Sequence, residues 1–326
     1  MTRSGVCWSV AIGALALALA APAAASAAPA APAVTGTIAV GSEPGWVAVN
    51  PATDAIYASN YGSDNVSVIN GRTDTVTDTI GVGDGPEQVA VNPKTDTLYV
   101  ANASDGTVSV INGRAGTPTA TVRVGPGPAG VAVDPENGAV YVANGGGNTV
   151  SVINGRTNTN IEAIVVGDDP FGVAFDPVTG DMYVTNYNSS TVSVINPRTG
   201  TPVGTIGLGA DANPLGIAVN PVTGTIYVAN NGTGTVSMID GWTSQVIATV
   251  TVGDAGSGLT AIAVDPVTGV VYVAAYLSDT VSVIRNRAVA ATITVAGGPE
   301  GVAVNPVTGT VYTANFVNGT VSVIWR

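Results

Sequence analysis

The sequence is most informative in what it lacks: its 326 residues include no histidine and only one cysteine. Histidine is the usual general base near neutral pH and the commonest metal ligand. Its absence excludes a Ser-His-Asp or Cys-His nucleophile and the zinc sites built on histidine. The chemistry that remains uses carboxylates, tyrosine, lysine or arginine, or metal ions held by oxygen ligands.

Positive charge is also scarce. Ten Lys and Arg residues stand against 22 Asp and Glu residues, which gives a net charge of −12 and a pI near 4.1. Proteins that follow a phosphate backbone usually carry a basic stripe, whereas this chain has a single lysine, Lys94, and scattered arginines. The composition therefore disfavours nucleic acid as a partner, and it suits an extracellular protein or one with cationic partners.

The N-terminal segment has the pattern of a secretory signal. Arg3 precedes a short apolar stretch at 10–21, and Ala25-Ser26-Ala27 matches an A-x-A cleavage site. The apolar stretch is too short for a good membrane span. We predict a signal peptide at 1–27, an Ala/Pro linker at 28–34, secretion to the extracellular side, and no membrane span after cleavage. The lone Cys7 leaves with the signal peptide.

The rest of the chain is one repeat. An Asn-Pro or Asp-Pro pair recurs at spacings of 42, 42, 42, 44, 45 and 40 residues. A period near 40 is typical of propellers and solenoids. The seven pairs are Asn50-Pro51, Asn92-Pro93, Asp134-Pro135, Asp176-Pro177, Asn220-Pro221, Asp265-Pro266 and Asn305-Pro306.

Each unit contains four short runs rich in Val, Ile, Thr and Tyr. Examples are GVAV at 130–133, YVAN at 99–102, VSVIN at 108–112 and TDTIGVG at 77–83, and turn residues separate the runs. No stretch of useful length has helical periodicity. Four strands joined by turns predict one antiparallel propeller blade in each repeat.

The two ends of the repeat region predict how the ring closes. The last unit, 301–326, lacks its fourth run, while a spare fourth run, TGTIAVG at 35–41, precedes the first unit. Pairing these segments removes the exposed edges of an open ring. We therefore predict an all-β fold: one seven-bladed β-propeller of four-stranded antiparallel blades over 35–326, closed by an N-terminal strand that completes the last blade.

The second run of each unit carries a family resemblance. Tyr183-Val184-Thr185-Asn186, its variants in the other units and the VSVI runs resemble the YVTN-repeat β-propeller family, which includes secreted, surface-layer and YncE-like proteins. The resemblance covers about 35–326 and implies an extracytoplasmic binding or structural protein. We expect the Asn that ends this run to bond the backbone at a strand end. The sixth unit departs from the pattern, because Ala275 stands where Asn is expected.

Aromatic residues divide into repeated and irregular ones. Seven of the ten tyrosines begin the YVTN-type runs, and we interpret them as packing between blades. Tyr61, Tyr187 and Tyr276 instead follow directly after the run, and Phe316 holds the same place in the seventh unit. This loop shares a face with the loop leading into the next unit. Because that face commonly carries ligand sites in propellers, these four residues are candidate binding residues.

The two residues that precede each VAV-type run also vary. Four units keep glycine at the second of these positions, where close approach to the axis leaves little room. Trp46 and Gln88 break this pattern, Glu87 and Glu300 add carboxylates, and Phe171 adds a ring; all five are candidate ligand-binding residues. The seven pairs are Gly45-Trp46, Glu87-Gln88, Ala129-Gly130, Phe171-Gly172, Leu215-Gly216, Thr260-Ala261 and Glu300-Gly301.

Ring closure makes the seventh, first and second units neighbours. We therefore expect six residues to gather in one sector of one mouth: Glu300, Trp46, Glu87, Gln88, Tyr61 and Phe316. Aromatic walls with two carboxylates suit a cation, through cation–π and charge contacts, or a hard Ca²⁺ or Mg²⁺ ion; no other cofactor is indicated. The alternative interpretation is that these are solvated loop residues.

These features favour a secreted or cell-surface, non-catalytic binding or scaffold protein that acts through the loops of one propeller face. We expect a monomer whose partner is a small molecule, a protein or a cell surface. The alternative is a propeller-type lyase or lactone hydrolase that uses Glu87 or Glu300 as a base, with or without a divalent metal. The similar metal-dependent lyase that opens streptogramin antibiotics implies a catalytic histidine, which this chain lacks.

Overall fold

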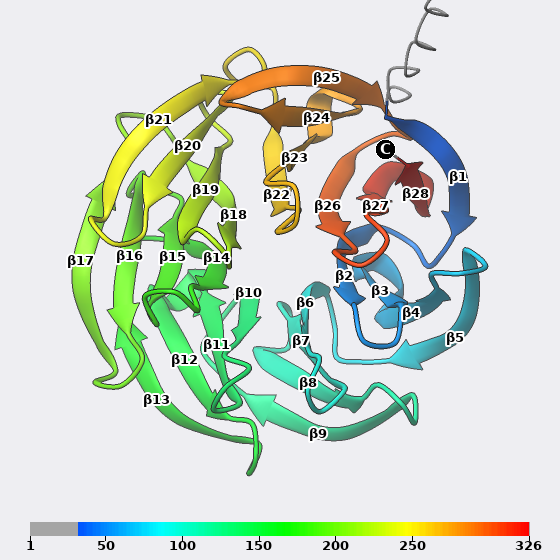
Figure 1. The fold of residues 1–326 in the computed structure, drawn as a ribbon. Helices are drawn as coiled ribbons and strands as arrows, with labels where there is room; N and C mark the ends of the chain where they lie inside the picture. The colour runs from blue at the N-terminus through cyan, green and yellow to red at the C-terminus, as the bar shows by residue number, and fades with distance from the viewer. Residues whose placement is uncertain (1–31, 326) are drawn as a thin grey trace, which may run out of the picture. The chain divides into compact units, whose positions relative to one another are not determined.

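A ring of seven four-stranded antiparallel sheets makes up residues 32–325, the part of the chain that the computed structural model describes (Figure 1). Four 3-10 turns are the only helices in this range, and none of them is long and apolar enough to cross a membrane. The prediction of an all-β, seven-bladed propeller is confirmed. The predicted signal peptide, 1–27, and linker residues 28–31 lie outside the described range.

The blades follow one another along the chain, and in each the first strand lies nearest the axis and the last at the rim (Figure 1). Blade 1 is β2 (Pro44–Asn50), β3 (Ala55–Asn60), β4 (Asn65–Asn70) and β5 (Thr75–Gly81). Blade 2 is β6 (Pro86–Asn92), β7 (Thr97–Asn102), β8 (Thr107–Asn112) and β9 (Thr117–Arg123). Blade 3 is β10 (Pro128–Val133), β11 (Ala139–Asn144), β12 (Thr149–Asn154) and β13 (Thr159–Val165). Blade 4 is β14 (Pro170–Phe175), β15 (Met182–Asn186), β16 (Thr191–Asn196) and β17 (Thr201–Gly207).

The remaining blades repeat this order. Blade 5 is β18 (Pro214–Asn220), β19 (Thr225–Asn230), β20 (Thr235–Asp240) and β21 (Gln245–Thr251). Blade 6 is β22 (Leu259–Val264), β23 (Val271–Ala275), β24 (Thr280–Arg285) and β25 (Ala288–Thr294). Blade 7 is β26 (Pro299–Val304), β27 (Val311–Asn315), β28 (Thr320–Trp325) and, from the other end of the chain, β1 (Ala33–Ala39).

The ring closes as the sequence predicts, through a strand exchanged between the chain ends. β1 pairs antiparallel with β28, and the register runs from Ala33 opposite Trp325 to Ala39 opposite Thr320. The strand begins at Ala33, two residues before the predicted start of the repeat region. A register shift between Val34 and Gly36 accommodates one extra residue on β1. No edge of the last blade is left open on the side of β28.

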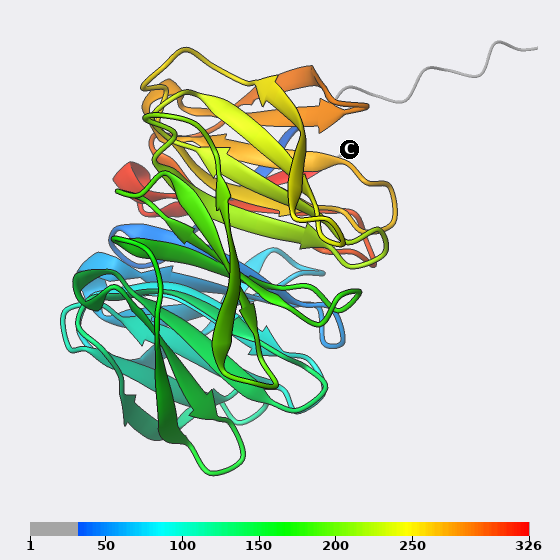
Figure 2. The same ribbon diagram turned by 90° about the vertical axis from the view of Figure 1, so that its left-hand side faces the viewer.

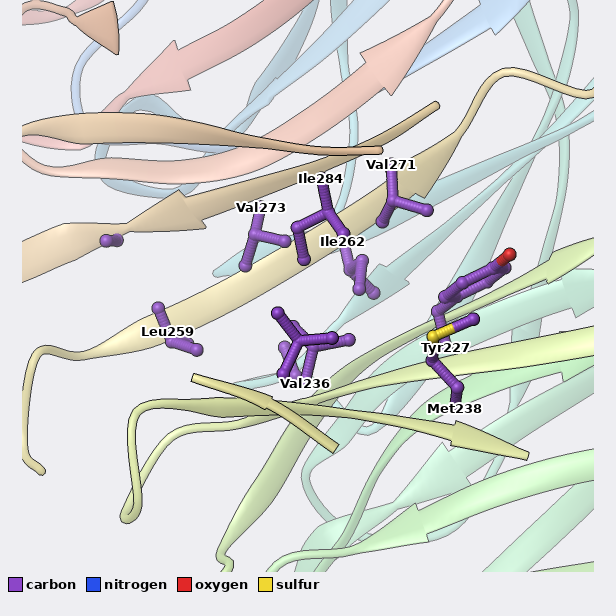
Figure 3. Packing of buried hydrophobic residues seen from close by; sticks show 11 residues of the cluster. Tyr227, Val236, Met238, Leu259, Ile262, Val271, Val273 and Ile284 are labelled. Atoms are coloured by element: carbon purple, nitrogen blue, oxygen red, sulfur yellow. The ribbon is translucent and has the colours of Figure 1, made fainter. Parts of the chain in front are cut away.

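The hydrophobic core is divided among the interfaces between neighbouring blades. In one of these, Tyr227 and Met238 of blade 5 pack against Leu259, Ile262 and other buried residues of blade 6 (Figure 3). The seven repeated tyrosines are all buried in such interfaces, as predicted. Because burial disfavours the charged phenolate, it raises the pKa of Tyr57, Tyr141, Tyr183 and Tyr312 to about 12. These tyrosines are scaffold residues and not bases.

The loops form two opposite faces of the ring (Figure 2). On the first, which we call the upper face, the loop between the second and third strands meets the segment that enters the same blade. In blade 1, for example, the backbone N–H of Tyr61 donates to Glu43 O at 2.9 Å, and in blade 6 that of Tyr276 donates to Gly258 O at 2.8 Å. The turns that join the first and second strands and the third and fourth strands form the lower face.

The asparagine that ends the second strand anchors the third strand of its blade. Asn186 is fully buried, and its Nδ2 donates to Thr191 Oγ1 at 3.0 Å and Ser193 Oγ at 2.9 Å. The same two hydroxyl contacts or close equivalents recur in the other blades that have this asparagine. The expected backbone bond is present in blade 4 as a third contact, from Gly167 N to Asn186 Oδ1 at 3.1 Å. The prediction was therefore right about backbone bonding here and missed the hydroxyl partners.

Candidate functional site

The seven innermost strands bring one residue each to the same level around the axis, near the upper face. This residue is the second of each strand, and we call the set the axial ring: Gly45, Glu87, Ala129, Phe171, Leu215, Thr260 and Glu300. Because blades 7, 1 and 2 are consecutive in the closed ring, Glu300, Gly45 and Glu87 stand next to one another. The expected neighbourhood of the two acids is therefore present.

Glu87 and Glu300 are neighbouring, partly buried carboxyls whose charge no nearby group balances in the described residues. A Cβ added to Gly45 would lie 3.7 Å from Glu300 Oε2, so this carboxyl extends over the glycine that separates the two acids. Neither carboxyl has a hydrogen-bond or ion-pair partner among residues 32–325. Desolvation raises the pKa of Glu87 to about 7; desolvation, with added repulsion from Glu87 and Glu43, raises that of Glu300 to about 8.

The side chain of Trp46 reaches beyond its own sector. Its ring lies 6.4 Å from that of Phe171, centroid to centroid, at 55° between planes, although the two residues belong to blades 1 and 4. It also packs against the buried cluster between blades 6 and 7. The indole therefore spans the axis, and Phe171, predicted only as an isolated candidate, becomes its partner.

Gln88 is turned into the interface between blades 2 and 3. It is 5% exposed, and its Oε1 accepts a hydrogen bond from Val131 N at 3.3 Å. At the same place in blade 7, a Cβ on Gly301 would lie 2.6 Å from Trp46 Cα, which explains why most blades need glycine there. The structure thus gives Gln88 an inter-blade contact and does not bring it to the carboxyls.

The upper-face aromatics lie beside the segments that lead to the two acids. Tyr61 Cε2 would be 3.2 Å from a Cβ on Gly85, and Tyr276 Cε2 would be 3.0 Å from one on Gly298. These glycines precede Pro86-Glu87 and Pro299-Glu300 in sequence. Phe316 contacts Tyr276 with ring centroids 6.2 Å apart.

Tyr187 belongs to the equivalent loop of blade 4, away from the acids. Its backbone N–H donates to Asp169 O at 2.9 Å, and its carbonyl accepts from Asn213 Nδ2 at 3.2 Å. These bonds hold its own loop to the linker entering blade 4 and to the next linker. Tyr187 therefore makes the same backbone bond as Tyr61 and Tyr276, but in a blade that carries neither acid.

Two hydroxyl groups that sequence reasoning missed position the acids. Ser59 Oγ donates to Glu87 O, and Thr260 Oγ1 donates to Glu300 O at 2.7 Å. Each bond runs from one blade to the next and fixes the backbone from which a carboxyl projects. A signal for Ser59 was present, because it replaces the alanine of most YVAN-type runs with a polar residue.

Charge is unevenly divided between the two faces when strand-end residues are counted with the loop they adjoin. Among residues 32–325, the upper face has eleven acidic residues and one basic residue, Arg123, whereas the lower face has nine acidic and seven basic residues. The upper-face acids are Glu43, Asp64, Asp84, Glu87, Asp105, Asp168, Asp169, Asp211, Asp254, Asp279 and Glu300. The two acids of the axial ring thus lie on a strongly negative face.

The acids do not gather into a dense metal-binding group. Within residues 32–325, no three or more acidic, cysteine or histidine side chains converge closely enough to hold an ion. Ca²⁺ takes six to eight oxygen ligands, more than the Glu87–Glu300 pair offers. The geometry is better matched to a ligand that needs one or two carboxylates.

The fold and this site define a seven-bladed β-propeller with two carboxyls at its axis that have no partner among the described residues. No protein-family model and no curated protein matches the sequence. Among solved structures, the chain is similar to a chain of Kuenenia stuttgartiensis hydrazine synthase, with a TM-score of 0.79, 22% identity, and 87% of this chain and 96% of that chain covered. It is also similar to a streptogramin B lyase, with a TM-score of 0.77, 12% identity and coverages of 87% and 94%. These likenesses establish the propeller fold.

Proposed function

We propose that this protein is a secreted or cell-surface, non-catalytic binding protein that holds a cationic ligand at the upper end of its propeller axis. The observation that carries the proposal is the Glu87–Glu300 pair, whose carboxyls flank Gly45 without a partner in residues 32–325. Burying charge without a counter-charge is costly. A bound cation supplies the missing counter-charge.

The distribution of charge over the two faces of the propeller also supports a positively charged ligand. Within residues 32–325, eleven acidic residues against one basic residue give the upper face a negative potential, which attracts cations and raises their local concentration. The lower face, with nine acids and seven bases, lacks this bias. Secretion is supported by the signal pattern at 1–27 and by the acidity of the chain.

The test is calorimetric titration and thermal shift of residues 28–326 with methylammonium, tetramethylammonium, Ca²⁺ and Mg²⁺. We expect the organic cations to raise the melting temperature of the natural chain and to have little effect on the Glu87→Gln/Glu300→Gln variant. Glu162→Gln, an exposed glutamate in β13, is the matched control. A response to metal ions alone would show that the site binds a metal ion and not an organic cation. No response to any cation would refute the proposal.

A second candidate function is a lyase or lactone hydrolase in which Glu87 is the general base. The specific observation in its favour is that burial raises the pKa of Glu87 to about 7, where a carboxylate exchanges protons effectively near neutral pH. One solved structure with a similar fold is described as a streptogramin B lyase. Turnover of a lactone or cyclic depsipeptide with a pH inflection near 7, abolished in Glu87→Gln, would establish this function in place of simple binding.

A further inference from the structure

The axial ring has two chemically different halves. Blades 7, 1 and 2 contribute Glu300, Gly45 and Glu87, whereas blades 3, 4 and 5 contribute Ala129, Phe171 and Leu215 at the same strand position. Blade 6 contributes Thr260, whose hydroxyl is already engaged by Glu300 O and Pro299 O. One half of the ring is therefore acidic and the opposite half is apolar.

Trp46 joins the two halves. It departs from β2 directly after Gly45, beside the acids, and its indole reaches Phe171 on the apolar side. Both aromatic side chains are only partly buried, so they retain surface that a ligand can cover. Because Trp46 directly follows Gly45, the glycine between the two acids, a ligand that extends from the acids across the axis can reach this aromatic pair, and cation–π contact is available to a positively charged head.

We infer that the ligand is a monovalent organic amine with an apolar body, an alkyl- or arylammonium ion, whose ammonium group lies between Glu87 and Glu300 and whose body packs on Trp46 and Phe171. This inference rests on the function proposed above and narrows its ligand class. An ammonium group donates up to three hydrogen bonds and can satisfy both carboxyls at once. A fully hydrophilic cation would leave the aromatic half of the site unused.

The charge of the acid pair favours one positive charge over two. Two neighbouring carboxylates repel each other. The loss of the first proton therefore raises the pKa of the remaining carboxyl. Burial raises the pKa of Glu87 to about 7 and that of Glu300 to about 8, so the pair carries fewer than two negative charges near neutral pH. Binding of a cation favours the ionised form, so the site releases protons as the amine binds.

The experiment compares methylammonium, 2-phenylethylammonium and the dication of putrescine by isothermal titration calorimetry, in two buffers of different ionisation enthalpy. We expect 2-phenylethylammonium to bind at least about tenfold more tightly than methylammonium, since its body covers apolar surface worth about 1.4 kcal/mol or more. Putrescine should be no tighter than methylammonium, and proton release should appear as a buffer-dependent heat near pH 7.

Variants separate the two halves of the site. Phe171→Ala should weaken 2-phenylethylammonium much more than methylammonium, and so remove most of the advantage of the larger amine, whereas Glu87→Gln/Glu300→Gln should weaken both. If Phe171→Ala fails to fold by circular dichroism, Phe171→Leu serves instead and should reduce the aromatic preference by a smaller factor. Val203→Ala, an exposed residue of β17, is the control.

The outcomes distinguish this inference from the function on which it rests. Equal affinity for methylammonium and 2-phenylethylammonium would overturn the apolar-body inference while leaving a cation-binding function intact. Tighter binding of putrescine than of either monocation would overturn the inferred single charge. Failure of every amine to bind would overturn both the inference and the proposed function.

Discussion

At the scale of single residues, Glu87 and Glu300 make the stability of the propeller depend on pH. Their pKa values, about 7 and about 8, lie above the ordinary value of 4.5, so between these limits the folded chain holds more protons than the unfolded chain. The free energy of unfolding therefore falls as pH rises from about 4.5 to about 8. We expect Glu87→Gln/Glu300→Gln to melt higher than the natural chain at pH 8.5, by on the order of a few °C, and to match it near pH 4.5.

Differential scanning calorimetry from pH 4.5 to 9 measures this difference. Glu162→Gln controls for the loss of one negative charge, because this residue is exposed on β13 and lies on the rim. The control should keep the pH slope of the natural chain. A double variant whose melting temperature falls just as steeply with pH would show that the two carboxyls ionise freely in the folded protein.

Several individual residues of the site were predictable from the repeat, and their contacts were not. Aligning the units places Glu87 and Glu300 at equivalent positions. Because the ring closes, their blades are two apart, and the proximity of the two residues follows from the blade order. The reach of Trp46 to Phe171 is different, because it depends on the width of the ring and on which side chains fill it. The contact of Gln88 could not be predicted either. Its side-chain rotamer determines whether the amide points to the axis or to Val131 in the blade interface.

At the scale of elements, the buried asparagine adds side-chain hydrogen bonds to the backbone pairing of the second and third strands. We expect Asn186→Ala to lower the free energy of unfolding by about 2 to 4 kcal/mol, because it removes three hydrogen bonds and strands the buried hydroxyl of Ser193. Urea unfolding measures the loss. Asn188→Ala, in the exposed loop two residues on, should change stability by no more than about 0.5 kcal/mol. Equal losses in the two variants would remove the special role of the buried residue.

Blade 6 shows how the propeller accommodates the absence of this asparagine. In blade 4, a Cβ on Gly167 would lie 2.6 Å from Asn186 Cγ; in blade 6, a Cβ on Gly253 would lie 2.8 Å from Ser257 Oγ. Ser257, in the longer linker that enters blade 6, thus fills space beside Ala275 that the amide occupies elsewhere. Its hydroxyl is buried without a hydrogen-bond partner within the described chain. The sequence pattern revealed the missing asparagine, but a substitute eighteen residues upstream of Ala275 had no signal in the motif.

At the scale of the whole molecule, the repeat period predicts more of the architecture than the individual motifs do. Seven units and a displaced fourth run were enough to predict the blade count, the strand order and the pairing of the chain ends. The unequal charge of the two faces follows from the same register, because each loop's position in the repeat assigns it to a face. The sequence therefore contained this asymmetry, and only the arrangement of side chains across the axis required the structure.

The strand exchange in blade 7 predicts how the ring responds to being opened elsewhere. Ala33 lies opposite Trp325, so a short glycine linker can join the present ends. One permutant is then opened in the turn at 113–116, where β9 becomes the new exchanged strand, and another in the linker at 124–127, where every blade is continuous. Both keep all 28 strands, but the second closes its ring by side-chain packing alone, without strand hydrogen bonds across the junction.

We expect the first permutant to melt within a few °C of the natural chain. The second should melt at a clearly lower temperature and form more aggregate by size-exclusion chromatography. Equal melting temperatures for the two permutants would mean that the exchanged strand contributes nothing to closure.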